Sequence, residues 1–133
     1  MQGAIGRAAG RERFRIVAGA GKEELVALYN GAELLASVAI YEGFCLPIVE
    51  AFACGTPVLG PDAGAVPEIA ADAAVLVAPR RVDTIAAEMY RLLKDQGLRK
   101  ELVERGKRRA AAFSWAEAAR KTLSVYEEVL ANS

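Results

Sequence analysis

Residues 42–58 read EGFCLPIVEAFACGTPV, and this stretch carries the strongest structural signals in the chain. An apolar run precedes it over Leu34–Tyr41, as is typical of a strand buried on both faces. A helix is expected over Pro47–Cys54, because proline is tolerated in a first turn and Gly55 can end the helix. A strand, a glycine loop and a helix in this order begin a βαβ unit, which predicts a parallel sheet.

The sequence on both sides continues this alternation of strands and helices. The further expected elements are the strands Phe14–Ala18, Pro57–Gly60 and Ala74–Val77 and the helices Lys22–Asn30 and Val66–Ala71. From Val82 onward the apolar spacing is helical only, and the last helix begins at Ser114, where Glu117 completes a capping box. The predicted fold class is therefore α/β: a partial Rossmann-like parallel sheet of about four short strands, flanking helices and a helical C-terminal third.

Composition narrows the function classes. The 133 residues are 53% hydrophobic, and 17 basic side chains balance 17 acidic ones. This excludes a disordered chain and removes the electrostatic basis for nucleic-acid binding. Apolar runs fall short of the roughly 20 residues that span a membrane. Histidine is absent, so no histidine base or Ser-His-Asp triad is available. Cys45 and Cys54 lie outside any CxxC pattern, which favours buried thiols in a cytoplasmic protein.

Two carboxylates, Glu42 and Glu50, flank the loop between the expected strand and helix. Both are expected at the carboxyl edge of the sheet, where open α/β sheets bind ligands, with Glu50 in the first helical turn. Gly43 would let the backbone approach a ligand, and the amides over Phe44–Ile48 would attract a phosphate. A structural interpretation is also open, because an acidic side chain near a helix start stabilises the helix without any ligand.

Residues 42–58 and four further segments resemble the signature of the group 1 (family 4) glycosyltransferases. The further segments are KEELVALY over 22–29, GAVPEI over 64–69, DAAVLV over 72–77 and FSW over 113–115. Members of this family are GT-B enzymes whose C-terminal domain binds the nucleotide-sugar donor. The resemblance begins near Arg13 and implies that residues 1–133 form an incomplete C-terminal, nucleotide-sugar-binding domain.

The resemblance also implies roles for individual residues. Glu42 would contact the donor sugar, and Glu50 would hold the nucleotide ribose. The loop between them would meet sugar hydroxyls and phosphate through Gly43, Phe44, Cys45 and Leu46. By the same resemblance, transfer retains the anomeric configuration and needs no cofactor and no essential metal. No residue of this chain is assigned as catalytic.

The chain departs from the family pattern in three places. Cys45 stands where the loop usually has a second glycine, so its sulfur is expected to crowd the sugar pocket. Val38 and Ala39 stand where the family often has Pro-Ser, which removes a hydroxyl contact. The two strand-helix units that carry an arginine and a lysine for the donor diphosphate have no counterpart, and Arg7 and Arg11 are interpreted as solvated charges.

Two functions are therefore considered. The first is a donor-binding fragment of a group 1 glycosyltransferase with an unknown acceptor. The alternative is a non-catalytic remnant or subunit that acts as an interaction module, and the sequence leaves open whether the chain is active alone. The expected partners are a nucleotide sugar and either a second copy or a separate N-terminal acceptor domain. The strand Phe14–Ala18 would lack its family neighbour, so it pairs with Leu34–Tyr41, pairs with another chain or stays unpaired.

Overall fold

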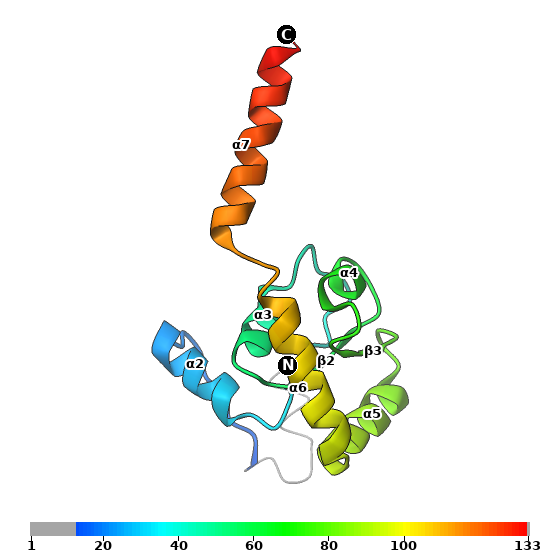
Figure 1. The fold of residues 1–133 in the computed structure, drawn as a ribbon. Helices are drawn as coiled ribbons and strands as arrows, with labels where there is room; N and C mark the ends of the chain where they lie inside the picture. Colours follow the sequence, from blue (N-terminus) through cyan, green and yellow to red (C-terminus); the bar gives the residue numbers. More distant parts are fainter. Residues whose placement is uncertain (1–12, 133) are drawn as a thin grey trace.

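The computed structural model describes residues 13–132, so Arg7 and Arg11 lie outside the described part. These residues form a compact body from which one long helix projects (Figure 1). The elements, in chain order, are α2 (Lys22–Gly31), β1 (Leu35–Ala36), α3 (Leu46–Ala53), β2 (Val58–Pro61), α4 (Val66–Ala70), β3 (Val75–Val77), α5 (Val82–Lys94), α6 (Gln96–Ala110) and α7 (Trp115–Ala131). The predicted α/β class with a helical C-terminal third is confirmed.

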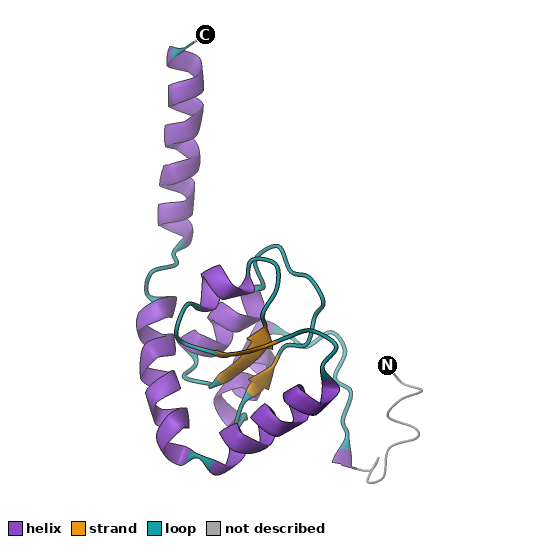
Figure 2. Ribbon diagram, turned by 90° about the vertical axis from the view of Figure 1, so that its right-hand side faces the viewer, coloured by secondary structure: helices purple, strands orange, loops and turns teal. Residues whose placement is uncertain are grey.

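A small parallel sheet lies at the centre of the body, with helices around it (Figure 2). The strand order is β1-β2-β3, and the register pairs Leu35 with Val58 and Leu59 with Val75. Parallel neighbours need crossover connections, which α3 and α4 supply here. β2 is fully buried as the central strand, so its four residues anchor the layers on both sides.

The expectation of about four strands is wrong for the described residues, where the sheet has three. Residues 14–18 are not in a strand, and the side chains of Phe14, Ile16 and Val17 are exposed. A strand needs a neighbour to satisfy its backbone groups, and β1 is the edge of the sheet here. The β-prone composition of residues 14–18 is therefore insufficient by itself, because strand formation depends on non-local pairing.

The strand expected over Leu34–Tyr41 is also much shorter. It spans Leu35–Ala36, and the Ser37 amide adds one further hydrogen bond to the Leu59 carbonyl at 2.9 Å. Beyond that point Val38, Ile40 and Tyr41 are exposed, with Tyr41 at 77%. Residues 37–45 therefore form a long loop that leads from the carboxyl end of β1 to α3.

The core lies between α3, the sheet and α6. Ile48, Ala51 and Phe52 of α3 are essentially fully buried. Gly106 of α6 allows this close approach, since a Cβ at that position would lie 2.8 Å from Cδ1 of the Phe52 ring. A second cluster packs α5 and α6 against the other side of the sheet through Leu59, Val77, Leu92 and Leu102. Helix α3, which follows the loop of residues 37–45, is thus held firmly by its packing against α6 and the sheet.

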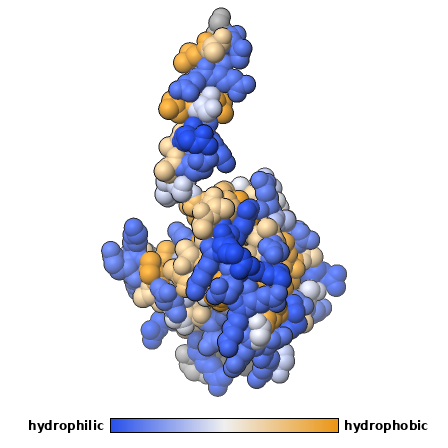
Figure 3. All heavy atoms as spheres, in the orientation of Figure 1, coloured by the Kyte–Doolittle hydropathy of each residue, from blue (hydrophilic) through white to orange (hydrophobic). Residues whose placement is uncertain are grey.

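The C-terminal helix α7 has no buried residue. Ser114 caps it as predicted, accepting a hydrogen bond from the Glu117 amide at 3.1 Å. The expected capping box is only half formed among the described residues, because the Glu117 carboxylate accepts two hydrogen bonds from Arg120 instead of one from the Ser114 amide. Apolar side chains stand exposed along its length (Figure 3). Within residues 13–132, no helix has the length and apolar composition needed to cross a membrane.

Candidate functional site

The two predicted carboxylates lie where the loop after β1 joins α3. Glu42 is partly buried and Glu50 is exposed. Because α3 begins at Leu46, Glu50 is its fifth residue and opens the second turn, which corrects the expectation of a first-turn position. One helical turn is 3.6 residues, so Glu50 stands over Leu46 on the same face of the helix. The helix dipole acts mainly on charges in the first turn. A purely helix-stabilising role for Glu50 is therefore less favoured than the sequence indicated.

Glu42 is fixed through its main chain. Its carbonyl oxygen accepts a hydrogen bond from the Ala65 amide at 3.0 Å. The preceding residue, Gly64, has φ +60°, and a Cβ built on it would lie 2.6 Å from the Glu42 carbonyl oxygen. The turn before α4 therefore seats the backbone of Glu42. The sequence had singled out residues 64–69 as a motif but gave no indication of this contact, which joins positions 22 residues apart.

Glu50 is fixed through its side chain. The Tyr29 hydroxyl donates a hydrogen bond to Oε2 of Glu50 at 3.0 Å. Tyr29 is only 8% exposed, and its carbonyl accepts a hydrogen bond from the buried Thr56 hydroxyl at 2.7 Å. Burial, followed by the hydrogen bond to Glu50, raises the pKa of Tyr29 to about 12. The contact of Tyr29 with Glu50 was not predicted from the sequence. The one signal for it was the position of an aromatic residue on the apolar stripe of the expected helix over Lys22–Asn30.

Cys45 occupies the turn between the two carboxylates. Its backbone is left-handed, with φ 66° and ψ 63°, the conformation that glycine adopts without strain. Its side chain is 5% exposed and packs in the same cluster as Tyr29 and Ile48, with Sγ 3.7 Å from the Ser37 hydroxyl. The sulfur thus lies in the hydrophobic cluster, and the expectation that it crowds the sugar pocket stays a prediction. Ser37 was not singled out from the sequence.

The start of α3 presents several amide donors. Pro47 has no N–H, and the Ile48 amide donates to the Cys45 carbonyl at 3.0 Å. The amides of Phe44, Cys45 and Leu46 have no acceptor in the part of the chain that the structure describes. A left-handed residue followed by a helical one turns successive amides to one side and forms an anion-binding concavity. Together with the helix N-terminus, this favours a phosphate group.

An apolar groove of about 570 Å³ runs beside Glu50, between α3 and the connection from α6 to α7. Leu46 and Trp115 contribute to its walls, and the rings of Phe44 and Phe113 meet edge to face at 5.6 Å. Arg109 lies over the Phe113 ring at 4.8 Å. The groove adjoins the carboxylate pair, so a ligand at Glu50 would have apolar surface next to it.

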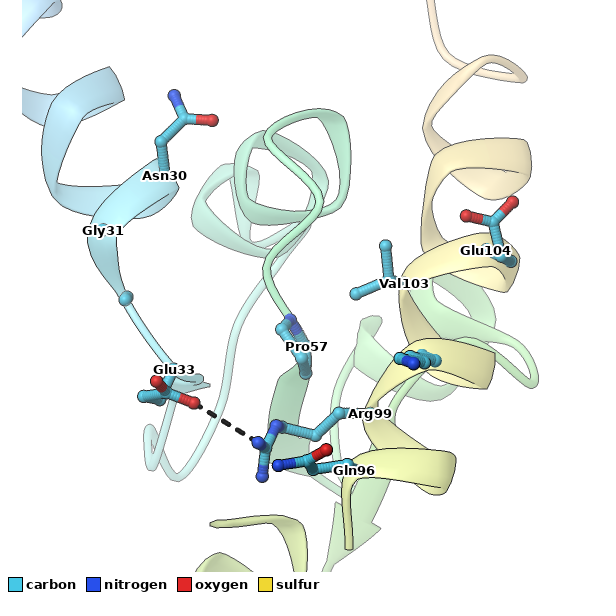
Figure 4. Close-up of a pocket in the computed structure, with 10 residues that line it drawn as sticks. Asn30, Gly31, Glu33, Pro57, Gln96, Arg99, Val103 and Glu104 are labelled. Carbon is cyan, nitrogen blue, oxygen red and sulfur yellow. Dashed lines mark ion pairs between the residues drawn. The ribbon is translucent and has the colours of Figure 1, made fainter.

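A second cavity lies at the opposite edge of the sheet, where β1 and β2 begin (Figure 4). Arg99 forms an ion pair with Glu33 at 3.5 Å and donates to the carbonyls of Leu92 and Leu93 at the end of α5. The guanidinium of Arg99, the main polar group of this cavity, is therefore already paired with other groups of the protein. Ligands of parallel sheets bind at the carboxyl edge, so the loop that carries Glu42 and Glu50 is the better candidate site.

Comparison of the sequence with known protein families identifies one that covers most of the chain. The model for glycosyl transferases group 1 matches residues 7–109 of this chain. The chain belongs to the group 1 glycosyltransferases. The match covers the loop, α3 and the turn before α4, which are the elements that position the two carboxylates.

Two relatives and two solved structures illustrate the relationship. The chain is 43% identical to MMP alpha-(1->4)-mannosyltransferase of Mycolicibacterium hassiacum over 85% of its length. It is 36% identical to O-antigen chain mannosyltransferase B of Escherichia coli over 79% of its length. Among structures, sucrose-phosphate synthase from Thermosynechococcus elongatus superposes with a TM-score of 0.82 at 29% identity, covering 92% of this chain and 31% of that one.

The second structure is the C-terminal domain of a group 1 glycosyl transferase from Francisella tularensis, with a TM-score of 0.65 and 30% identity over 73% of this chain and 51% of that one. The chain spans only 28% of the length of the two mannosyltransferases. The shared region is therefore one part of each of those longer proteins.

The residues predicted for the donor site form one continuous stretch of chain, in which the side chain of Cys45 is buried. Glu42, Gly43, Phe44, Cys45 and Leu46 follow one another into α3, and Glu50 stands one turn further on. Their individual contacts with a donor stay predictions. Among residues 13–132, no group of three or more cysteine, aspartate or glutamate side chains is placed to hold a metal ion.

Proposed function

We propose that this chain binds a nucleotide-diphosphate sugar and supplies the donor site for a retaining group 1 glycosyl transfer. The observation that carries the proposal is the set of amides at the start of α3 that have no acceptor among residues 13–132, with a carboxylate on each side. Donors in the middle suit a diphosphate, and acceptors at the flanks suit hydroxyl groups. This is the alternation of groups that a nucleotide sugar presents.

In this assignment Glu42 accepts hydrogen bonds from the donor sugar, with Gly43 allowing close approach of the backbone. The amides of Phe44, Cys45 and Leu46 face the diphosphate. Glu50 accepts from the ribose. In the transfer, the bond between the anomeric carbon and the diphosphate oxygen breaks, a bond from that carbon to the oxygen of an acceptor hydroxyl forms, and the proton of the hydroxyl passes to the leaving diphosphate. We propose no cofactor or metal for this chain, and we assign the acceptor to a separate N-terminal acceptor domain.

The relatives suggest which donor to test first. Two of them are mannosyltransferases by name, so a mannosyl donor is the first choice, with GDP-mannose and UDP-glucose as probes that differ in base and sugar. Calorimetric titration of the folded chain should give saturable binding to one of them. An absence of heat at millimolar ligand would contradict donor binding.

The matched variants are Glu50→Gln and Glu127→Gln. The first removes the proposed ribose acceptor and should weaken binding about tenfold, as expected for a hydrogen bond to a charged group. The second changes an exposed glutamate on α7, away from the loop, and should leave the affinity unchanged. Equal losses in both variants would indicate a non-specific charge effect.

A second candidate function is self-association, favoured by the exposed apolar face of α7 and by the place of β1 at the edge of the sheet. Leu123, Tyr126 and Leu130 are each more than half exposed, and exposed apolar surface of this kind marks interaction sites. Sedimentation equilibrium at tens of micromolar should then show a dimer or larger species. A monomer at that concentration would contradict this candidate and leave donor binding intact.

A further inference from the structure

Tyr29 lies at the end of α2, one layer behind the candidate site. Its ring is buried in the cluster that contains Ile48 and Phe52. Its carbonyl is held by the Thr56 hydroxyl at 2.7 Å and by the Ala32 amide at 3.1 Å. The hydroxyl at the far end of the ring reaches Oε2 of Glu50 at 3.0 Å. The side chain is thus fixed at the backbone and along the ring, and its remaining polar atom points at the exposed carboxylate.

We propose that Tyr29 is a positioning residue for donor binding: its hydroxyl holds one oxygen of Glu50 and leaves the other to accept from the ribose. The inference rests on the proposed function of Glu50. An exposed glutamate samples several rotamers and loses that freedom on binding a ligand. A carboxylate already held in one orientation has less freedom to lose, so its ligand binds more tightly.

The direction of the hydrogen bond follows from the chemistry of the two groups. An ionised carboxylate only accepts, so the tyrosine hydroxyl must donate. Burial, followed by the hydrogen bond to Glu50 and the nearby Glu50, Cys54 and Cys45, raises the pKa of Tyr29 to about 12. Tyr29 is therefore protonated, and able to donate, throughout the neutral pH range. Positioning by Tyr29 should accordingly be independent of pH between 6 and 9.

The test is a double-mutant cycle that combines Tyr29→Phe with Glu50→Ala. Phenylalanine keeps the ring and its packing and removes only the hydroxyl. Tyr29→Phe alone should weaken calorimetric binding of the donor's nucleoside diphosphate about five- to tenfold, as expected for a hydrogen bond to a charged group. In the Glu50→Ala background the same change should have no further effect. Tyr126→Phe, on the exposed face of α7, is the matched control and should leave binding unchanged.

A purely structural role for Tyr29 predicts a different pattern. Equal losses of affinity in both backgrounds would overturn positioning through Glu50, and so would no loss in either. If the folded wild-type chain does not bind, the proposed function itself fails. If Glu50→Ala binds as tightly as wild type, the ribose role of Glu50 fails, and the positioning role fails with it. Absorbance titration supplies a ligand-independent signature: a late-ionising tyrosine that disappears in Tyr29→Phe and ionises at lower pH in Glu50→Ala.

Discussion

Glu42 and Glu50 lie eight residues apart and are held in opposite ways. The backbone of Glu42 is seated by the Gly64–Ala65 turn, and its carboxylate has no hydrogen-bond partner among residues 13–132. Glu50 projects from a packed helix, and its carboxylate is held by Tyr29. A carboxylate on a loop can adapt to its ligand, whereas one on a helix with a supporting hydrogen bond is preorganised. This difference fits a sugar contact at Glu42 and a ribose contact at Glu50.

The turn at Gly64 and Ala65 holds the backbone of Glu42, and Gly64→Ala should disrupt this contact. Of the changes considered, it should have the largest effect on stability. The new Cβ would lie 2.6 Å from the Glu42 carbonyl oxygen, at a residue with φ +60°. A left-handed conformation and the steric overlap together should lower the free energy of unfolding by about 3 kcal/mol. Urea denaturation measures the change.

Gly43→Ala is the control for this substitution. Gly43 has an ordinary φ, and a Cβ there would meet nothing within 4 Å. Its unfolding free energy should stay within about 0.5 kcal/mol of wild type. If the two alanine variants are equally stable, the Gly64 turn does not seat Glu42.

The side-chain anchor of Glu50 can be weakened by pH. The pKa of Tyr29 is raised from 10 in the unfolded chain to about 12 in the folded one. The stability that it contributes is thus complete below pH 10 and is lost as pH rises through 12. Two pKa units bound the effect at about 3 kcal/mol, and solvent screening lowers this to about 1–2 kcal/mol.

The measurement is the difference in unfolding free energy between wild type and Tyr29→Phe at pH 9 and at pH 12. Other groups titrate in both proteins and cancel in the comparison. The stability advantage of wild type should shrink over this range. A constant difference would show that the hydroxyl gains nothing from its environment in the folded state.

Cys45 lies in the turn between the two carboxylates, and substitutions there should change stability by a smaller amount that reports on its backbone conformation. Cys45→Gly relieves the left-handed conformation, worth about 1 kcal/mol, but removes a buried side chain. Cys45→Ala removes the sulfur and keeps the strain, so it should be less stable than the glycine variant by about 1 kcal/mol. Thermal unfolding of the two variants gives the order. Alanine above glycine would contradict the left-handed backbone at this residue.

Removing α7 should have the smallest effect on stability, because the contacts that hold Glu42 and Glu50 lie outside this helix. A chain that ends at Ser114 loses no buried residue, and neither Tyr29 nor Gly64 contacts the helix through a hydrogen bond. Its unfolding free energy should lie within about 0.5 kcal/mol of the full chain. A large loss would show that the body depends on α7.

The sequence predicted those parts of the fold that depend on local signals. The helix over residues 47–54 was expected to within a residue or two from Pro47 and Gly55, and Ser114 was recognised as the cap of α7. The prediction of a strand over residues 14–18 was wrong, because strand pairing depends on a neighbour that the local sequence does not encode. The two carboxylates were singled out by their spacing and by the family motif, and their contacts with a donor stay predictions. Their anchors, Gly64 and Tyr29, were not, because each contact joins positions more than 20 residues apart.

The most direct test of the central assignment separates the sugar from the nucleotide. Calorimetry should compare a nucleotide sugar with its nucleoside diphosphate, each titrated into wild type, Glu42→Gln and Glu50→Gln. Glu42→Gln should weaken binding of the nucleotide sugar and leave the nucleoside diphosphate unchanged, whereas Glu50→Gln should weaken both about tenfold. If Glu42→Gln weakens the nucleoside diphosphate as strongly as the nucleotide sugar, or if neither variant changes either affinity, the assignment of the two carboxylates is contradicted.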